Sequence, residues 1–97
     1  MAGKDWLEEL RQRSETARRL ATDVPPVLDR DELSLEDATD LFQLLTRFAS
    51  AMEEMIFAMY REGGGEGEIR TAEQIGSIFD ELAAGAAQRM IDIRRRR

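Results

Sequence analysis

Apolar residues recur every three or four positions in three segments of the chain, and proline and glycine separate these segments. This spacing is that of one face of an α-helix, whereas a half-buried strand would alternate at every second residue. A chain of 97 residues fits a single domain. The pattern therefore predicts an all-α fold, with three helices in one domain over residues 1–97.

The first helix is expected at about 5–22, with Asp5 as its N-cap. Its predicted apolar stripe consists of Leu7, Leu10, Ala17, Ala21 and Val24, widened by Trp6 and Leu20. Arginine and glutamate fill the opposite face, so the helix is predicted to be amphipathic. Proline lacks a backbone N–H and disfavours helical backbone at the preceding residue. We therefore expect Pro25 and Pro26 to lie in a linker over 23–34.

The second helix is expected at about 35–62, beginning after an N-cap at Ser34. Its water-facing side is marked by charged residues that repeat every seven positions with alternating sign, namely Asp40, Arg47, Glu54 and Arg61. Apolar residues fill four further rows along this helix, more than the single stripe that an edge helix needs. The helix is therefore predicted to contact more than one neighbour.

The apolar rows of the second helix contain an expected interaction face. Its members are Leu41, Leu45, Phe48, Met52, Met55, Ile56 and Met59. Methionine is unbranched and polarizable, so it suits adaptable binding surfaces, but it also fills gaps in ordinary cores. With Phe57 and Tyr60 added near the end of the helix, three helices are expected to leave part of this surface uncovered. A twofold dimer, in which two hairpins form a four-helix core, would cover it.

The glycine-rich segment 63–70, with the sequence GGGEGEIR, is predicted to be a hinge. A phosphate-binding loop would need Lys and Ser or Thr after the glycines, whereas Glu66 and Glu68 stand among them. The spacing of an EF-hand calcium loop is missing as well. Glycine ends a helix and lets the chain reverse its direction at low steric cost.

The third helix is expected at about 72–93, with a capping box formed by Thr71 and Gln74. Its predicted core positions are Ile75, Ile78, Phe79, Leu82, Ala86, Met90 and Ile93. If the chain folds back about residues 65 and 66, the second and third helices form a long antiparallel hairpin. In that register Phe79 meets Met52, and the small residues Ala83 and Ala86 meet Phe48 and Leu45.

Composition removes several kinds of chemistry. The chain has no cysteine and no histidine, which excludes disulfides, thiolate nucleophiles and the usual zinc ligands. We expect no enzymatic activity, no catalytic or metal-binding residue and no cofactor. No apolar run of ~18 residues is present to span a membrane, so no membrane partner and a cytoplasmic location are expected. Thirteen of the fourteen basic residues are arginine, which favours a bacterial or phage origin.

Charge is distributed unevenly around a net value of −6. Residues 31–68 contain ten acids and two bases, which opposes broad binding to phosphate. The basic end comprises Arg94, Arg95, Arg96 and Arg97. These arginines are expected to favour the dipole at the end of the third helix, and the alternatives are an acidic partner surface or a phosphate contact.

The expected function is a non-catalytic protein–protein interaction module: an assembly subunit, adaptor, inhibitor or chaperone-like protein. Its expected partner is a second copy or another protein. The alternative is a dimeric accessory protein associated with nucleic acid, or an acidic regulator that imitates DNA. The glycine-rich hinge has no tryptophan, so the chain lacks the Trp-x-Gly turn of small secreted helical hairpins, and no family resemblance is claimed.

Overall fold

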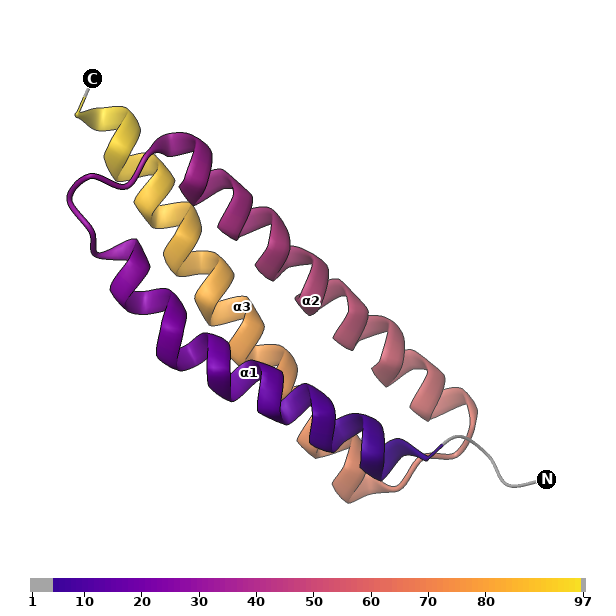
Figure 1. The fold of residues 1–97 in the computed structure, drawn as a ribbon. Coiled ribbons are helices and arrows are strands. Elements are labelled where there is room, and N and C mark those ends of the chain that lie inside the picture. Colours follow the sequence, from indigo (N-terminus) through magenta and orange to yellow (C-terminus); the bar gives the residue numbers. More distant parts are fainter. Residues whose placement is uncertain (1–4, 97) are drawn as a thin grey trace.

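The computed structural model describes residues 5–96, and within them it consists of α1 (Trp6–Leu28), α2 (Leu35–Arg61) and α3 (Glu66–Arg95). No strand occurs in the described residues, so the prediction of an all-α fold with three helices is confirmed. The molecule measures 57 × 21 × 19 Å, with a radius of gyration of 15.7 Å. A compact chain of this length would have about 12.5 Å, so the three helices form an elongated bundle (Figure 1).

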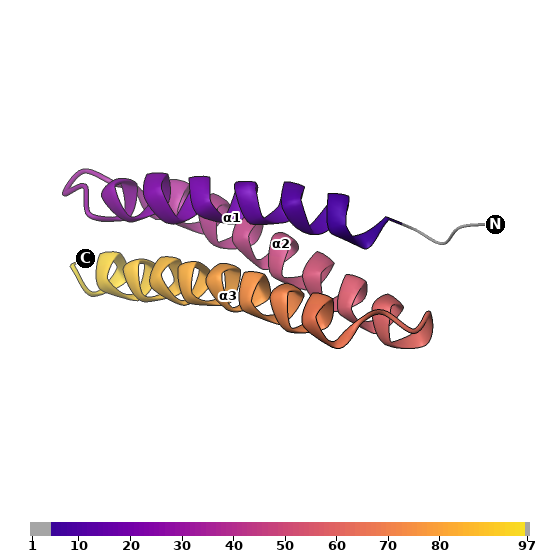
Figure 2. The same ribbon diagram turned by 90° about the horizontal axis from the view of Figure 1, so that it is seen from below.

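The three helices run nearly parallel to the long axis and alternate in direction. α2 and α3 pack closely as an antiparallel hairpin, and α1 packs mainly along α3. Figure 2 shows α1 on one side of α3, while α2 passes obliquely behind both. We call the end where α2 turns into α3 the hinge end, and the end with the linker between α1 and α2 the open end.

The two prolines lie inside α1, so the expected end of this helix near residue 22 is wrong. The helix continues to Leu28, and the backbone N–H of Asp29 still donates to the carbonyl of Pro25 at 3.1 Å. Both prolines are exposed, while Val24 and Leu28 are buried. A proline costs ~3 kcal/mol or more inside a helix, and burial of each of the two apolar side chains returns ~1.5–3 kcal/mol. The stabilisation from burying Val24 and Leu28 therefore offsets the cost of the hydrogen bonds that the two prolines cannot form.

α2 begins as its N-terminal sequence predicts. The hydroxyl of Ser34 accepts a hydrogen bond of 3.0 Å from the backbone N–H of Asp37, which satisfies one of the free donors in the first turn. The four charged residues of the predicted water-facing row, Asp40, Arg47, Glu54 and Arg61, are all exposed.

The hinge is shorter than the expected segment 63–70, because α3 begins at Glu66. Gly63 has a φ of 74°, which favours glycine. The backbone N–H of Gly64 donates to the carbonyl of Met59, and the carboxylate of Glu68 accepts from the N–H of Gly65 at 3.1 Å. The start of α3 is therefore capped by Glu68. The expected capping box at Thr71 is wrong, since its hydroxyl donates to the carbonyl of Gly67 within the helix.

The observed register of the hairpin differs from the expected one by about one helical turn. The rings of Phe48 and Phe79 stack, with centroids 5.2 Å apart and an interplanar angle of 17°. A Cβ atom added to Gly76 would lie 3.7 Å from the Cβ atom of Met52. Because the hinge is shorter, α3 begins earlier, and Gly76 faces Met52 in place of the expected Phe79.

The core extends through the whole bundle in two adjoining clusters. The cluster nearer the hinge end contains Trp6, Leu10, Ala17, Met52, Met55, Met59, Ile69, Ala72, Ile75 and Phe79. The cluster nearer the open end contains Val24, Leu28, Leu45 and Ala86. Two members of the expected stripe of the first helix, Leu7 and Ala21, are exposed, because Trp6 and Leu10 turn the buried side of α1 away from them. Among the described residues, none of the helices is both long and apolar enough to cross a membrane.

Candidate interaction surface

The structure places the expected interaction face mostly in the interior of the single chain. Four of its seven residues are buried: Leu45, Met52, Met55 and Met59. The other three, Leu41, Phe48 and Ile56, are half-buried. Met52, Met55 and Met59, which we call the methionine row, therefore pack against α1 and α3 within the chain. They leave no continuous exposed surface of their own.

Two exposed aromatic side chains lie near the hinge end of α2. The side chain of Phe57 is 65% exposed and that of Tyr60 is 60% exposed. They are three residues apart and therefore lie on one side of the helix. Leu7 is similarly exposed at 67%, whereas the other exposed large apolar side chains, Ile91 at 44% and Leu44 at 38%, are less so. The sequence had indicated Phe57 and Tyr60 as residues that three helices would leave uncovered.

Tyr60 lines a pocket of about 430 Å³ between α2 and α3 at the hinge end. The other lining residues are Gly64, Glu66, Ile69, Arg70 and Glu73. Arg70 and Glu66 form an exposed ion pair of 3.9 Å on its rim. The surroundings of Tyr60 are therefore charged, with more acids than bases.

The pocket belongs to a longer surface, which we call the outer face. Phe42 precedes Tyr60 by eighteen residues, and Ile91 follows Glu73 by the same interval. Eighteen residues are about five turns of an α-helix, so each pair shares one side of its helix. The outer face consists of Phe42, Ala49, Glu53, Phe57 and Tyr60 of α2 and Glu73, Ser77, Asp80, Ala84 and Ile91 of α3. α1 packs on a different side of α3, near Leu82 and Gly85.

The basic end of the chain adjoins the outer face at the open end. Arg94 and Arg95 lie in the last turn of α3 and are exposed. They follow Ile91 by three and four residues, the spacing that places side chains next to one another on a helix. Arg96 donates to the carbonyl of Asp31 at 3.4 Å. The expected contribution of Arg97 lies outside the described residues.

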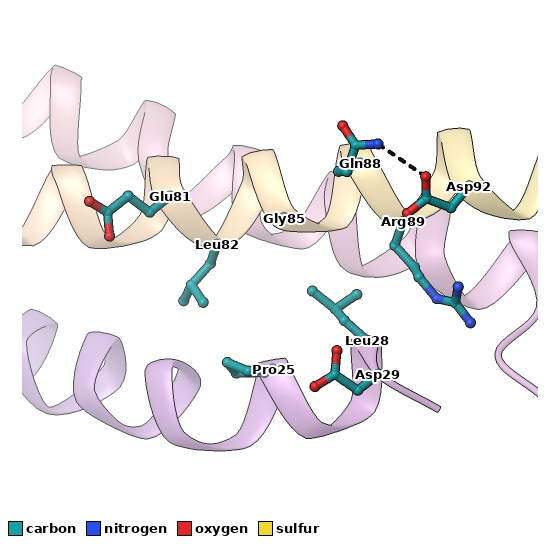
Figure 3. A pocket seen from close by; sticks show the side chains of 9 residues that line it. All are labelled: Pro25, Leu28, Asp29, Glu81, Leu82, Gly85, Gln88, Arg89 and Asp92. Atoms are coloured by element: carbon teal, nitrogen blue, oxygen red, sulfur yellow. Dashed lines mark hydrogen bonds between the residues drawn. The ribbon is translucent and has the colours of Figure 1, made fainter. Parts of the chain in front are cut away.

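A second cleft, of about 380 Å³, lies between α1 and α3 at the open end (Figure 3). Leu28 of α1 and Leu82 of α3 extend into it from opposite sides. Its rim is polar, and Gln88 donates to the carboxylate of Asp92 at 3.0 Å. A Cβ atom added to Gly85 would lie 3.6 Å from Leu28, so the two helices approach closely here. The cleft is the seam where α1 packs on α3.

Arg89 is a structural residue that sequence reasoning missed. Its Nη2 atom donates to the carbonyl of Arg30 at 2.6 Å, and its Nε atom is buried without a hydrogen-bond partner. Arg89 and Arg96 are seven residues apart, so they extend from the same side of α3 and hold consecutive residues of the linker. That spacing was visible in the sequence, although nothing there showed that the linker would lie against α3.

Within residues 5–96, no three carboxylates cluster closely enough to hold a metal ion. No protein-family profile matches the chain, and comparisons with curated proteins and with solved structures give no significant match. The interpretation of function therefore depends on the surfaces described above.

Proposed function

We propose that this chain is a non-catalytic protein–protein interaction module whose outer face contacts a partner protein. The observation that carries this proposal is the exposure of Phe57 and Tyr60 beside a pocket with a charged rim. Tyrosine and phenylalanine are enriched where proteins bind one another, and a polar rim around apolar residues is the usual arrangement of an interface. In this proposal the methionine row supports the face from within, because it fixes α2 against α3.

The proposal is tested by photo-crosslinking in the cells from which the gene comes. A photoreactive phenylalanine analogue replaces Phe57, and a matched control carries it at Leu7, which is 67% exposed but lies on α1. We expect one defined protein adduct from position 57 and none of the same mass from position 7. Equal patterns of adducts from both positions, or no protein adduct from position 57, would contradict the proposal.

A further inference from the structure

We infer that the outer face binds the outer face of a second copy in antiparallel orientation, so that the hinge end of each copy lies against the open end of the other. This inference rests on the proposed function and names the partner of the same surface. It stacks the α2–α3 pair of one copy on that of the other as a four-helix bundle, with α1 on the far side of each pair.

Charge complementarity between the two ends of the outer face favours this orientation. At the hinge end, the exposed acids Glu66 and Glu73 line the pocket with Tyr60, and Arg70 is the neighbouring base. The exposed acids Glu53 and Asp80 lie near the middle of the face. At the open end, the exposed bases Arg94 and Arg95 follow Ile91. In a parallel pair, like charges would meet at both ends. In an antiparallel pair, the acids at the hinge end of each copy face the arginines at the open end of the other.

The apolar residues of the outer face fit the same arrangement. Phe57 and Tyr60 lie at the hinge end, while Ile91 and the half-buried Phe42 lie at the open end. An antiparallel twofold axis near the middle of the face stacks α2 on α2 and α3 on α3, so Phe57 and Tyr60 of one copy lie on Phe42 of the other, with Ile91 on the adjoining helix. Near this axis lie the small residues Ala49 and Ala84, one turn from the exposed acids Glu53 and Asp80.

The outer face is large enough for a stable pair. α2 is 27 residues long, about 40 Å, and two helices side by side are about 20 Å wide. The face therefore offers roughly 800 Å² per copy, the area that a standard specific interface buries on each side. A twofold axis uses the same patch on both copies and leaves no open surface that would lead to fibres.

A charge-reversal experiment tests the inference by light scattering after size-exclusion chromatography. Wild-type protein at several hundred micromolar should have about twice the mass of 11.1 kDa. The variants Glu66→Arg with Glu73→Arg, and Arg94→Glu with Arg95→Glu, should each raise the dissociation constant about tenfold or more, since like charges then meet at both ends. An equimolar mixture of the two variants should form the heterodimer, because each now complements the other.

Two further variants separate the interface from folding. Tyr60→Arg should abolish the dimer, whereas Leu7→Arg, at an equally exposed position on α1, should leave it intact, and circular dichroism should show helix in both. A wild-type monomer at every concentration, or a dimer that survives both charge reversals, would overturn the inference. A monomer that still gives a crosslink to another protein from position 57 would overturn this inference alone and leave the proposed function standing.

Discussion

Individual side chains contribute to this protein very unequally, depending on their burial. Phe79, Leu45, Met52 and Met59 are the largest fully buried side chains among the described residues. Each fills space that water would otherwise occupy, and close packing makes their shape as important as their hydrophobicity. Exposed residues of the same chemical type, such as Phe57, contribute little to the fold and remain available for contact.

The first prediction compares two phenylalanines. Phe79 has no exposed surface and stacks on Phe48, so Phe79→Ala should lower the free energy of unfolding by ~3–5 kcal/mol. Phe57→Ala, at a position that is 65% exposed, should change it by less than ~0.5 kcal/mol. Urea denaturation followed by circular dichroism, at a protein concentration that keeps the chain monomeric, measures both. Similar losses from the two variants would show that the assignment of the core is wrong.

The second prediction concerns the exposed carboxylate of Glu8. A hydrogen bond of 2.6 Å from the side chain of Arg11 holds the pKa of Glu8 below its ordinary value, because it favours the charged form. Stability from this pair is therefore present above the ordinary pKa of a glutamate and is lost as the pH falls through the lowered value in the folded chain. Both side chains are exposed, so salt should weaken the effect.

An NMR titration of the Glu8 side-chain carbon measures this pKa directly. In Arg11→Ala the pKa of Glu8 should rise toward the ordinary value. In Arg18→Ala, a substitution further along the same helix, the pKa of Glu8 should not change. An unchanged value in Arg11→Ala would mean that the pair does not form in solution.

At the scale of helices, most of the fold could be predicted from the sequence, and the differences have identifiable physical reasons. Caps at Asp5 and Ser34 are local hydrogen bonds, so the residues beside them were sufficient to predict them. The end of α1 was mispredicted, because burial of Val24 and Leu28 against α2 and α3 outweighs the local effect of the two prolines. That burial is a tertiary contact, which the local sequence does not contain.

The candidate surface was less predictable than the helices. The wide apolar stripe on α2 predicted more than one neighbour. In the structure α2 packs closely on α3 and meets α1 mainly near the hinge end, and the sequence could not show which rows its own chain would cover. Met52 and Met59 became core once α1 and α3 were in place, and Phe57 and Tyr60 remained outside. The difference depends on the rotation of α2 within the bundle, which is set by the short hinge.

The third prediction tests this hinge with two glycine substitutions. Gly63 has a positive φ, so Gly63→Ala should lower the free energy of unfolding by ~1–2 kcal/mol. Gly67 lies in the first turn of α3, and a Cβ atom added there meets nothing within 4 Å. Gly67→Ala should therefore raise the free energy of unfolding by ~0.5–1 kcal/mol. Thermal melting of the two variants should shift in opposite directions, and shifts of the same sign would contradict the described hinge.

The fourth prediction concerns the prolines of α1. Replacing Pro25 and Pro26 by alanine restores two backbone donors in the last turn of α1, so the free energy of unfolding should rise by ~1–3 kcal/mol. The gain is reduced by ~0.4–1 kcal/mol for each proline, because the unfolded chain becomes more flexible. Chemical denaturation measures the net change. A net loss of stability would mean that the prolines direct the chain into the linker.

At the scale of the whole molecule, shape limits how two copies can associate. The bundle is 57 Å long and only about 20 Å thick, so a pair joined at its ends would be far longer than a pair joined along its sides. An antiparallel pair through the outer face keeps the length of one copy and increases its thickness.

The fifth prediction follows from this geometry. Small-angle X-ray scattering of concentrated wild-type protein should give a doubled mass, while the longest dimension stays near the 57 Å of one copy. In the charge-reversed variants the mass should halve, while the length stays almost unchanged. A longest dimension of about twice that value in the wild type would show end-to-end association and exclude the outer face as the contact.

The position of α3 as the helix on which both others pack has a consequence for synthesis of the protein. A ribosome releases α1 and α2 first, and these two helices contact each other mainly near the hinge end, so much of the buried side of α1 stays uncovered until α3 emerges. Arg89, which holds the linker from α3, emerges later still. Assembly of the bundle therefore waits until nearly the entire polypeptide has left the exit tunnel, and translation that stops after α2 should yield a chain that proteases and chaperones treat as unfolded.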